Sequence, residues 1–138
     1  MAEMSDPEAR TRAFARVIGP FVCLAAGILA IRAAHMAALL PAFFANPIWP
    51  TFLGALLLLG GICIIAFHRN WTGAAAIAIS LLGWFTALRG VILMALPDLM
   101  AEGADFSLQF TPVVQIGFAA VSLAGLALAW VGWRPPRT

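Results

Sequence analysis

The chain of 138 residues contains no lysine, and charged side chains of any kind are scarce. All eight basic residues are arginines spread along the sequence, and Asp and Glu together contribute only six residues. Proteins that bind nucleic acids gather their basic side chains into a patch or stripe. The scattered arginines and the net charge of +2 therefore argue against a nucleic-acid partner.

Cysteine and catalytic motifs are also scarce. The two cysteines, Cys23 and Cys63, lie in separate apolar stretches without CxxC or zinc-ligand spacing, so they indicate neither a disulfide framework nor a metal site. We interpret both as packing residues. The sequence has no GxSxG, no HExxH and no glycine-rich phosphate loop. We therefore expect no catalytic residues and no cofactor, and we predict that the protein is not an enzyme.

Apolar residues are abundant instead. They make up 63% of the chain, charged residues make up 10%, and the mean hydropathy is +0.98. Soluble domains are roughly 45–50% apolar and about 25% charged. A chain this short has too little interior to bury such an excess in water. The composition predicts that a lipid bilayer surrounds much of the protein.

Four segments are long and apolar enough to cross a bilayer, which takes about 20 residues. Backbone amides in hydrocarbon must be bonded within their own segment, and the segments lack strand alternation, so each is predicted to be a helix. Thr111 and Pro112 fit the N-cap and first position of the last one. The chain is thus predicted to be one all-α integral membrane domain, residues 1–138, folded as a compact four-helix bundle. The predicted spans are 14–31, 48–67, 72–96 and 112–133.

The connections between these spans differ in character. Residues 32–47 contain Pro41 and Pro47, which favour a short separate helix in the outer interface, with continuation of the first helix as the alternative. Residues 68–71 form a tight turn, and residues 97–112 form a longer acidic loop. Tryptophans mark the predicted span ends, where their rings favour the headgroup region, at Trp49, Trp71, Trp130 and Trp133.

Arginine distribution predicts the orientation of the spans. Loops on the cytoplasmic side are enriched in basic residues. One side carries six arginines, whereas Arg32 is the only one in the connections on the other side. Both termini are therefore predicted to be cytoplasmic. A cleaved signal peptide is the alternative reading of the first span. The six arginines are Arg10, Arg12, Arg16, Arg69, Arg134 and Arg137.

Small side chains recur on one face of each predicted helix, where they let helix backbones approach closely. The third span carries the most regular stripe, at spacings of four and three, and we predict that it packs against a neighbouring helix. Its members are Ala76, Ser80, Gly83, Ala87 and Gly90. We expect Ser80 to bond back to a backbone carbonyl. The other stripes comprise Gly19, Cys23, Ala26 and Ala30, then Gly54 and Gly61, then Gly117, Ala120, Ala124 and Ala127.

No acid lies within a predicted span. Ion-coupled transporters normally keep an ionisable acid in the membrane, and the small multidrug exporters of similar size rely on a glutamate in their first span.

The two histidines, His35 and His68, are predicted to lie on opposite sides, roughly 25–30 Å apart. They are too far apart to share a metal, so we interpret each as an interfacial polar residue.

Arg89 is the one charge deep within the third span. A buried arginine keeps its proton and costs about 2.5–3.5 kcal/mol at the centre of a spanning helix. Its side chain can reach toward the outer surface, where Arg32, Asp98 and Glu102 are expected. These four residues form the candidate site, for which three interpretations are open. The charges could hold the acidic loop onto the bundle, they could form a pocket for an anionic ligand or a lipid headgroup, or they could contact another membrane subunit.

The turn "HRNW" followed by "LLGWFTALRGVILMALPD" resembles a loose group of small bacterial four-helix inner-membrane proteins of unknown function. The shared pattern falls on Trp71, Gly83–Trp84, Arg89–Gly90 and Pro97. The group more often has lysine at the position of Arg89. The resemblance extends over about positions 15–98 and implies the fold, without implying an activity.

The leading functional hypothesis is a structural or accessory membrane protein that packs with itself or within a larger membrane complex. The first alternative is a lipid- or anion-binding protein that uses the Arg89 site. The second is a small oligomeric transporter. The lipid bilayer is the partner common to all three.

Overall fold

The computed structural model describes residues 6–134, and within them it contains five α-helices and no strand. All except α4 are long and apolar enough to cross a membrane, so the expected four apolar helices are confirmed. The helices are α1 (Pro7–Ala45), α2 (Ile48–Phe67), α3 (Ala74–Ala95), α4 (Pro97–Leu108) and α5 (Thr111–Trp133).

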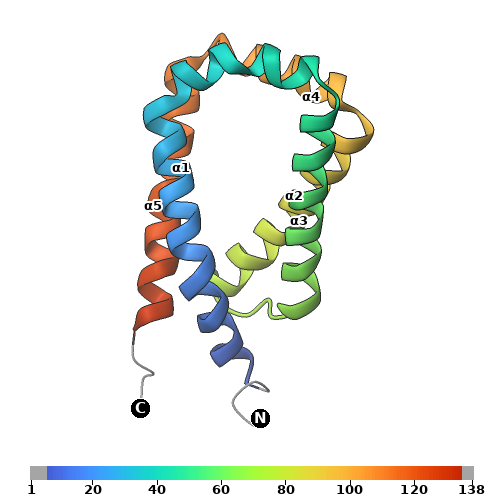
Figure 1. Cartoon of the computed structure of the whole chain (residues 1–138). Helices are drawn as coiled ribbons and strands as arrows, with labels where there is room; N and C mark the ends of the chain where they lie inside the picture. The colour runs from blue at the N-terminus through green and yellow to red at the C-terminus, as the bar shows by residue number, and fades with distance from the viewer. Residues whose placement is uncertain (1–5, 135–138) are drawn as a thin grey trace.

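Helix α1 is longer than the span predicted for it at both ends. Asp6 caps its start by accepting a 3.0 Å hydrogen bond from the amide of Glu8, and Pro7 occupies the first turn. At the other end the predicted separate helix over 32–47 is wrong, because α1 continues through Pro41 to Ala45. A proline removes one backbone hydrogen bond, but the alanine-rich segment before it favours helix strongly enough to continue. The last part of α1 turns away from its first part and runs across one end of the molecule (Figure 1).

The acidic segment after α3 is helical, so the predicted loop over 97–112 is wrong for most of its length. Pro97 stands at the start of α4 and Asp98 in its first turn, where a fixed φ and a negative charge both favour a helix. The cap expected at Thr111 is also displaced, because Thr111 is already helical and Phe110 precedes the helix as its N-cap.

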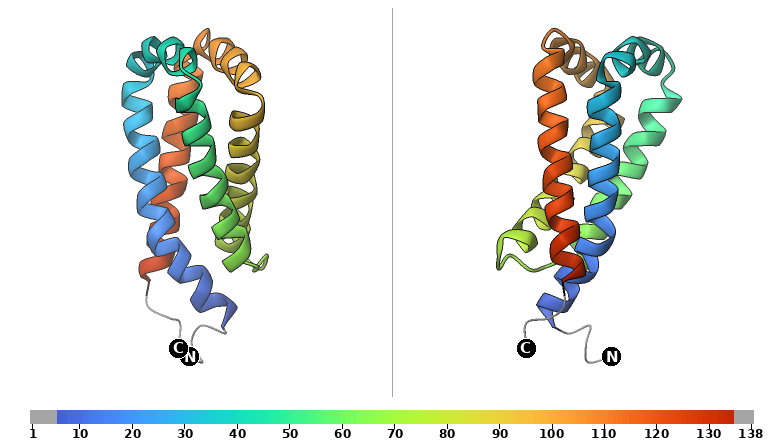
Figure 2. Two further views of the ribbon diagram at one scale, coloured as in Figure 1. Left: turned by 45° about the vertical axis from the view of Figure 1, so that its right-hand side comes forward. Right: turned by 90° about the vertical axis from the view of Figure 1, so that its left-hand side faces the viewer.

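The four long helices lie in two pairs rather than in the expected compact bundle. Helix α1 packs along α5 and α2 packs along α3, whereas contacts between the pairs are few (Figures 1 and 2). At one end, the last part of α1 and α4 bridge the two pairs. At the other, the start of α1 approaches the start of α3 (Figure 1). In each long helix the glycines that touch another backbone lie on one face, so the helix has one close neighbour and not two.

Glycine brings α2 and α3 into backbone contact. A Cβ atom on Gly61 would collide with the backbone of Ala87, and one on Gly90 would lie 2.5 Å from the amide nitrogen of Leu58. Gly83 sits against the side chain of Ile64. Backbones this close exclude any larger side chain between the two helices.

The α1–α5 contact uses the same principle with polar links added. A Cβ atom on Gly125 would lie 2.5 Å from the amide nitrogen of Cys23. The Ser122 hydroxyl donates a 2.8 Å hydrogen bond to the Cys23 carbonyl, and Arg16 Nε donates a 2.7 Å bond to the Gly132 carbonyl. These links fix the register of the pair at its middle and at one end.

The small-residue stripe expected on the last helix is wrong in its register. Its four residues are all exposed, and a Cβ atom on Gly117 would meet nothing within 4 Å. The face that contacts α1 carries Gly125 and Gly132 instead. Alanine is frequent enough to mark two faces of this helix, and the glycines select the face of closest approach. The exposed residues are Gly117, Ala120, Ala124 and Ala127.

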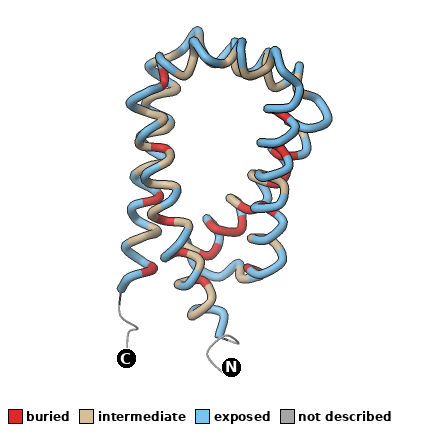
Figure 3. The backbone as a smooth tube through the Cα atoms, in the orientation of Figure 1, coloured by how far each residue is buried: buried red, intermediate tan, exposed pale blue. Residues whose placement is uncertain are grey.

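Large apolar side chains lie mostly on the outside of both pairs. Among the described residues only Ile79 and Pro50 have large side chains that are fully buried. Figure 3 shows the buried positions along the lines of helix contact, with most of each helix exposed. The chain thus has hardly any conventional core, as expected of helices that meet an apolar solvent.

Candidate functional site

A buried polar cluster joins the start of α1 to the connection between α2 and α3. We call it the His68 cluster, and its members are Thr11, His68, Asn70 and Ser80. His68 is 2% exposed, Ser80 3% and Thr11 7%. Buried polar groups in proteins are normally hydrogen-bonded, and each member of this cluster is bonded to another.

The imidazole of His68 lies between two hydroxyl groups. Its Nε2 is 3.2 Å from Thr11 Oγ1, and its Nδ1 is 3.1 Å from Ser80 Oγ. Asn70 closes the cluster, because its Nδ2 donates to Thr11 Oγ1 over 3.2 Å and its carbonyl accepts from Ser80 Oγ over 3.0 Å. The His68 ring thereby joins three segments: α1, α3, and the connection that runs from α2 to α3.

The hydroxyl protons of this cluster are already used by backbone carbonyls. Thr11 Oγ1 donates to the Pro7 carbonyl over 2.9 Å, and Ser80 Oγ donates to the Asn70 carbonyl. A neutral imidazole has one N–H and one lone pair. One ring nitrogen therefore donates to the hydroxyl oxygen beside it, and the other ring nitrogen accepts. In either tautomer, the hydroxyl beside the accepting nitrogen must share its single proton between that nitrogen and a backbone carbonyl.

The surroundings of His68 favour its neutral form. Burial is the main cause that lowers the pKa of His68 from its ordinary value, and the positive charge of Arg10 lowers it further. The ring of Phe14 packs edge-on against the imidazole, with centroids 5.4 Å apart, and excludes water from that side. The arrangement differs from a Ser-His-acid triad, because the second ring nitrogen faces Thr11 and not a carboxylate.

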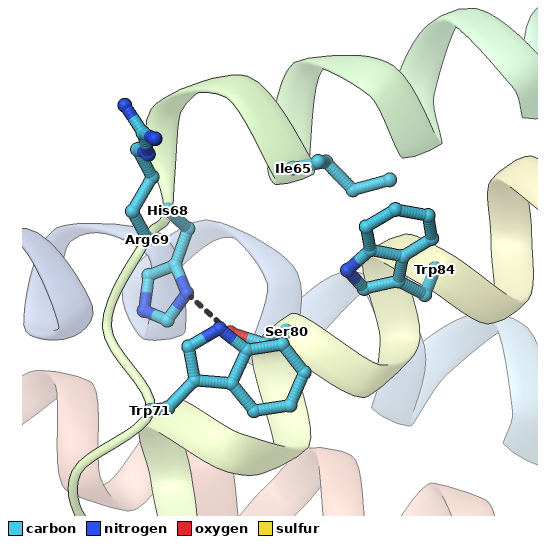
Figure 4. Close-up of a pocket in the computed structure, with 6 residues that line it drawn as sticks. All are labelled: Ile65, His68, Arg69, Trp71, Ser80 and Trp84. Carbon is cyan, nitrogen blue, oxygen red and sulfur yellow. Dashed lines mark hydrogen bonds between the residues drawn. The ribbon is translucent and has the colours of Figure 1, made fainter.

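A pocket of about 420 Å³ opens beside the cluster. Figure 4 shows the rings of Trp71 and Trp84 along its sides, with both indole nitrogens on the side that faces His68 and Ser80. The whole lining consists of Ile65, His68, Arg69, Trp71, Ser80 and Trp84.

The structure does not link the four residues of the predicted Arg89 site. Arg32, Arg89, Asp98 and Glu102 are all exposed, and within residues 6–134 no hydrogen bond or ion pair joins any two of them. Direct pairing between Arg89 and the acids of α4 is therefore absent from the described structure. Binding of a ligand or lipid headgroup at Arg89 remains a prediction.

The predicted packing stripe of α3 is buried at all five positions. Gly83, Ala87 and Gly90 meet α2, as described above. Ser80 has a second role, because its side chain belongs to the His68 cluster. It bonds to a carbonyl as expected, but that carbonyl belongs to Asn70 and not to the preceding turn of its own helix.

The two histidines differ sharply in environment. His35 is exposed, whereas His68 is buried by the protein at the end of α2, and the interfacial position expected of each stays a prediction. The sequence reading missed Thr11 and Asn70 because it began the first helix only at residue 14 and placed no partner beside "HRNW". Within residues 6–134, no group of three His, Cys, Asp or Glu side chains is placed to hold a metal ion.

Comparison of the chain with protein-family models, with curated proteins and with solved structures finds no match. The resemblance to small bacterial inner-membrane proteins therefore rests on the sequence motif alone.

Proposed function

We propose that the chain is a multi-pass protein of a bacterial inner membrane and serves as a packing subunit, associating with itself or within a larger membrane assembly. Four helices of suitable length and hydropathy support membrane insertion. The start of α1, the end of α2 and the end of α5 lie at one end of the molecule, which we call the arginine-rich end (Figure 1). Its described arginines support a cytoplasmic location for that end and are Arg10, Arg12, Arg16, Arg69 and Arg134.

One observation carries the proposed packing role. Helix α1 buries its small residues against α5 and leaves a stripe of large apolar side chains more than half exposed. The stripe repeats at spacings of four and three, which keeps one face of a helix directed at a partner helix. We call it the α1 stripe, and it consists of Val17 (72% exposed), Phe21 (69%), Leu24 (66%), Ile28 (56%) and Ile31 (83%).

The α1 stripe has the geometry that interdigitation with a second helix requires. Its spacing matches the seam of a left-handed helix pair, in which each large side chain fits into a hole on the partner. In a bilayer such contacts gain from van der Waals packing and not from removal of water. The strength of association therefore depends on the shape of these side chains.

Association in a bilayer can be measured directly. Full-length chains labelled with donor or acceptor dyes are reconstituted together, and energy transfer is followed as lipid is added. We expect energy transfer to fall as added lipid dilutes the protein in the bilayer. For the double variant Phe21→Ala/Leu24→Ala we expect an association constant about tenfold lower than that of the unchanged chain. Phe85→Ala is the matched control, because Phe85 is 62% exposed but lies on α3. Equal effects of the two changes, or no transfer at high protein density, would contradict self-association through the α1 stripe.

A further inference from the structure

The pocket beside His68 has the composition of a binding site for a phosphate group at a membrane surface. Its lining includes Arg69 and two indole N–H donors and contains no acid, and the Arg69 side chain extends outward past His68, away from the two indoles (Figure 4). Arg69 is exposed, Trp71 is 51% exposed and Trp84 is 57% exposed, so all three side chains are accessible from outside. Within residues 6–134 neither indole nitrogen has a hydrogen-bond partner.

From this arrangement we propose that the pocket lined by Arg69, Trp71 and Trp84 binds the phosphate of an anionic phospholipid in the cytoplasmic leaflet. The guanidinium, once the flexible side chain of Arg69 turns inward, supplies charge and a planar set of donors, which suit phosphate oxygens. Trp71, at a predicted span end, adds an N–H donor from a ring that favours the headgroup region, and Trp84, within α3, adds a second N–H donor. The bonded pair His68 and Ser80 forms the back wall, which fixes the shape of the pocket.

The depth of the pocket matches that of a lipid headgroup. Ile65 lies two residues before the end of α2, which is about 3 Å along a helix axis. His68, Arg69 and Trp71 follow in the connection between α2 and α3. A phosphate at the connection would leave the acyl chains beside Ile65 and the ring of Trp84, where the exposed surface is apolar.

The apolar wall distinguishes a lipid from free phosphate as the occupant. A small anion needs only the donors, whereas Ile65 and the ring faces of Trp71 and Trp84 offer apolar contact area beside them. The volume of about 420 Å³ is within the usual range for a small-molecule site and exceeds what a phosphate group alone fills. Anionic lipids give the cytoplasmic leaflet its negative surface potential, so anionic phospholipids are available on that side of the membrane.

The test measures lipid retention by native mass spectrometry of the full chain in a mild detergent. Phosphatidylglycerol is the anionic probe, phosphatidylcholine the zwitterionic comparison and inorganic phosphate the competitor. We expect one phosphatidylglycerol to be retained in preference to phosphatidylcholine, and inorganic phosphate not to displace it. Arg69→Gln should weaken retention about tenfold, and Trp71→Phe, which keeps a ring but removes the N–H, several-fold.

Arg134→Gln is the matched control, because it removes an exposed arginine from the same end of the molecule but outside the pocket. Equal loss of phosphatidylglycerol retention in Arg69→Gln and Arg134→Gln would mean that diffuse surface charge holds the lipid, and would overturn the proposed site. Displacement by millimolar phosphate would overturn the lipid as its occupant. The proposal rests on membrane insertion, so recovery of the chain without detergent would contradict that earlier proposal instead.

Discussion

His68 illustrates how a neighbour far along the chain can decide the state of one residue. Alone, the sequence "HRNW" describes a polar turn. Thr11, 57 positions earlier, closes one side of the imidazole, and Ser80 closes the other. Once the ring is enclosed, burial and the charge of Arg10 favour loss of its proton. The charge state of this turn therefore depends on how α1 begins.

We expect this histidine to make the fold sensitive to acid. A group whose pKa is lowered by folding binds fewer protons when folded, so the free energy of unfolding rises with pH. The stabilisation is complete above the ordinary value of 6.5 and is lost as pH falls toward the lowered pKa. Unfolding of the protein in detergent, followed by circular dichroism at pH values between about 7.5 and about 5, the range in which histidine titrates, should detect the loss.

Substitution of each histidine separates this effect from general acid sensitivity. His68→Gln retains hydrogen-bonding groups but does not titrate, so it should flatten the dependence between these pH values. His35→Gln should leave the dependence unchanged, because His35 is exposed. An unchanged pH profile in His68→Gln would contradict the assignment.

At the scale of elements, two adjacent glycines of α2 offer a direct test of how the helices pair. A Cβ atom on Gly61 would strike the backbone of Ala87, whereas one on Gly60 would meet nothing within 4 Å. We expect Gly61→Ala to destabilise the protein by about 1–3 kcal/mol, as overpacking does in tight cores.

Gly60→Ala should instead be neutral or stabilising by up to about 1 kcal/mol, because alanine favours helix more than glycine does. Both free energies can be measured by unfolding in mixed micelles of increasing denaturing detergent. Equal effects from the two neighbouring positions would show that α2 and α3 do not pack as described.

The sequence was sufficient to locate α2, α3 and α5, but it missed both ends of α1 and the whole of α4. Hydropathy marks the long apolar runs directly. The start of α1 and all of α4 depend on local signals at Asp6, Pro7, Pro97 and Asp98, which a hydropathy window passes over. The α5 register was missed because alanines are spread over more than one of its faces, and only the partner helix determines which face is used.

At the scale of the whole molecule, the arginine-rich end is the basis for orientation. Glu102 in α4 and Arg134 after α5 lie at opposite ends of the molecule (Figure 1). In chains with Cys23 and Cys63 changed to alanine, we expect Glu102→Cys to react with an impermeant thiol reagent in intact cells. Arg134→Cys should react only after the cells are opened. Labelling of Arg134→Cys from outside would reverse the proposed topology. Arg137 belongs to the same predicted side but lies outside the described residues.

The arrangement in pairs could not be predicted from the sequence. Composition indicates how many helices cross, and small-residue stripes indicate that each has a close neighbour, but neither indicates which helices are neighbours. The polar pairings Ser122–Cys23 and Arg16–Gly132 span 99 and 116 positions, respectively. Such contacts become visible only when the chain is folded, because no local pattern links residues so far apart.

The two pairs also have a mechanical consequence. Within each pair the backbones touch, so sliding or separating α1 from α5 breaks many contacts at once. Between the pairs the contacts are few, and those at the arginine-rich end include the bonds around His68. The motion that costs the least free energy should therefore be a change in the angle between the α1–α5 pair and the α2–α3 pair, with His68 near the point about which they rotate. If the chain is inserted as proposed, the lateral pressure of the bilayer, which varies with depth and thickness, would act on this angle.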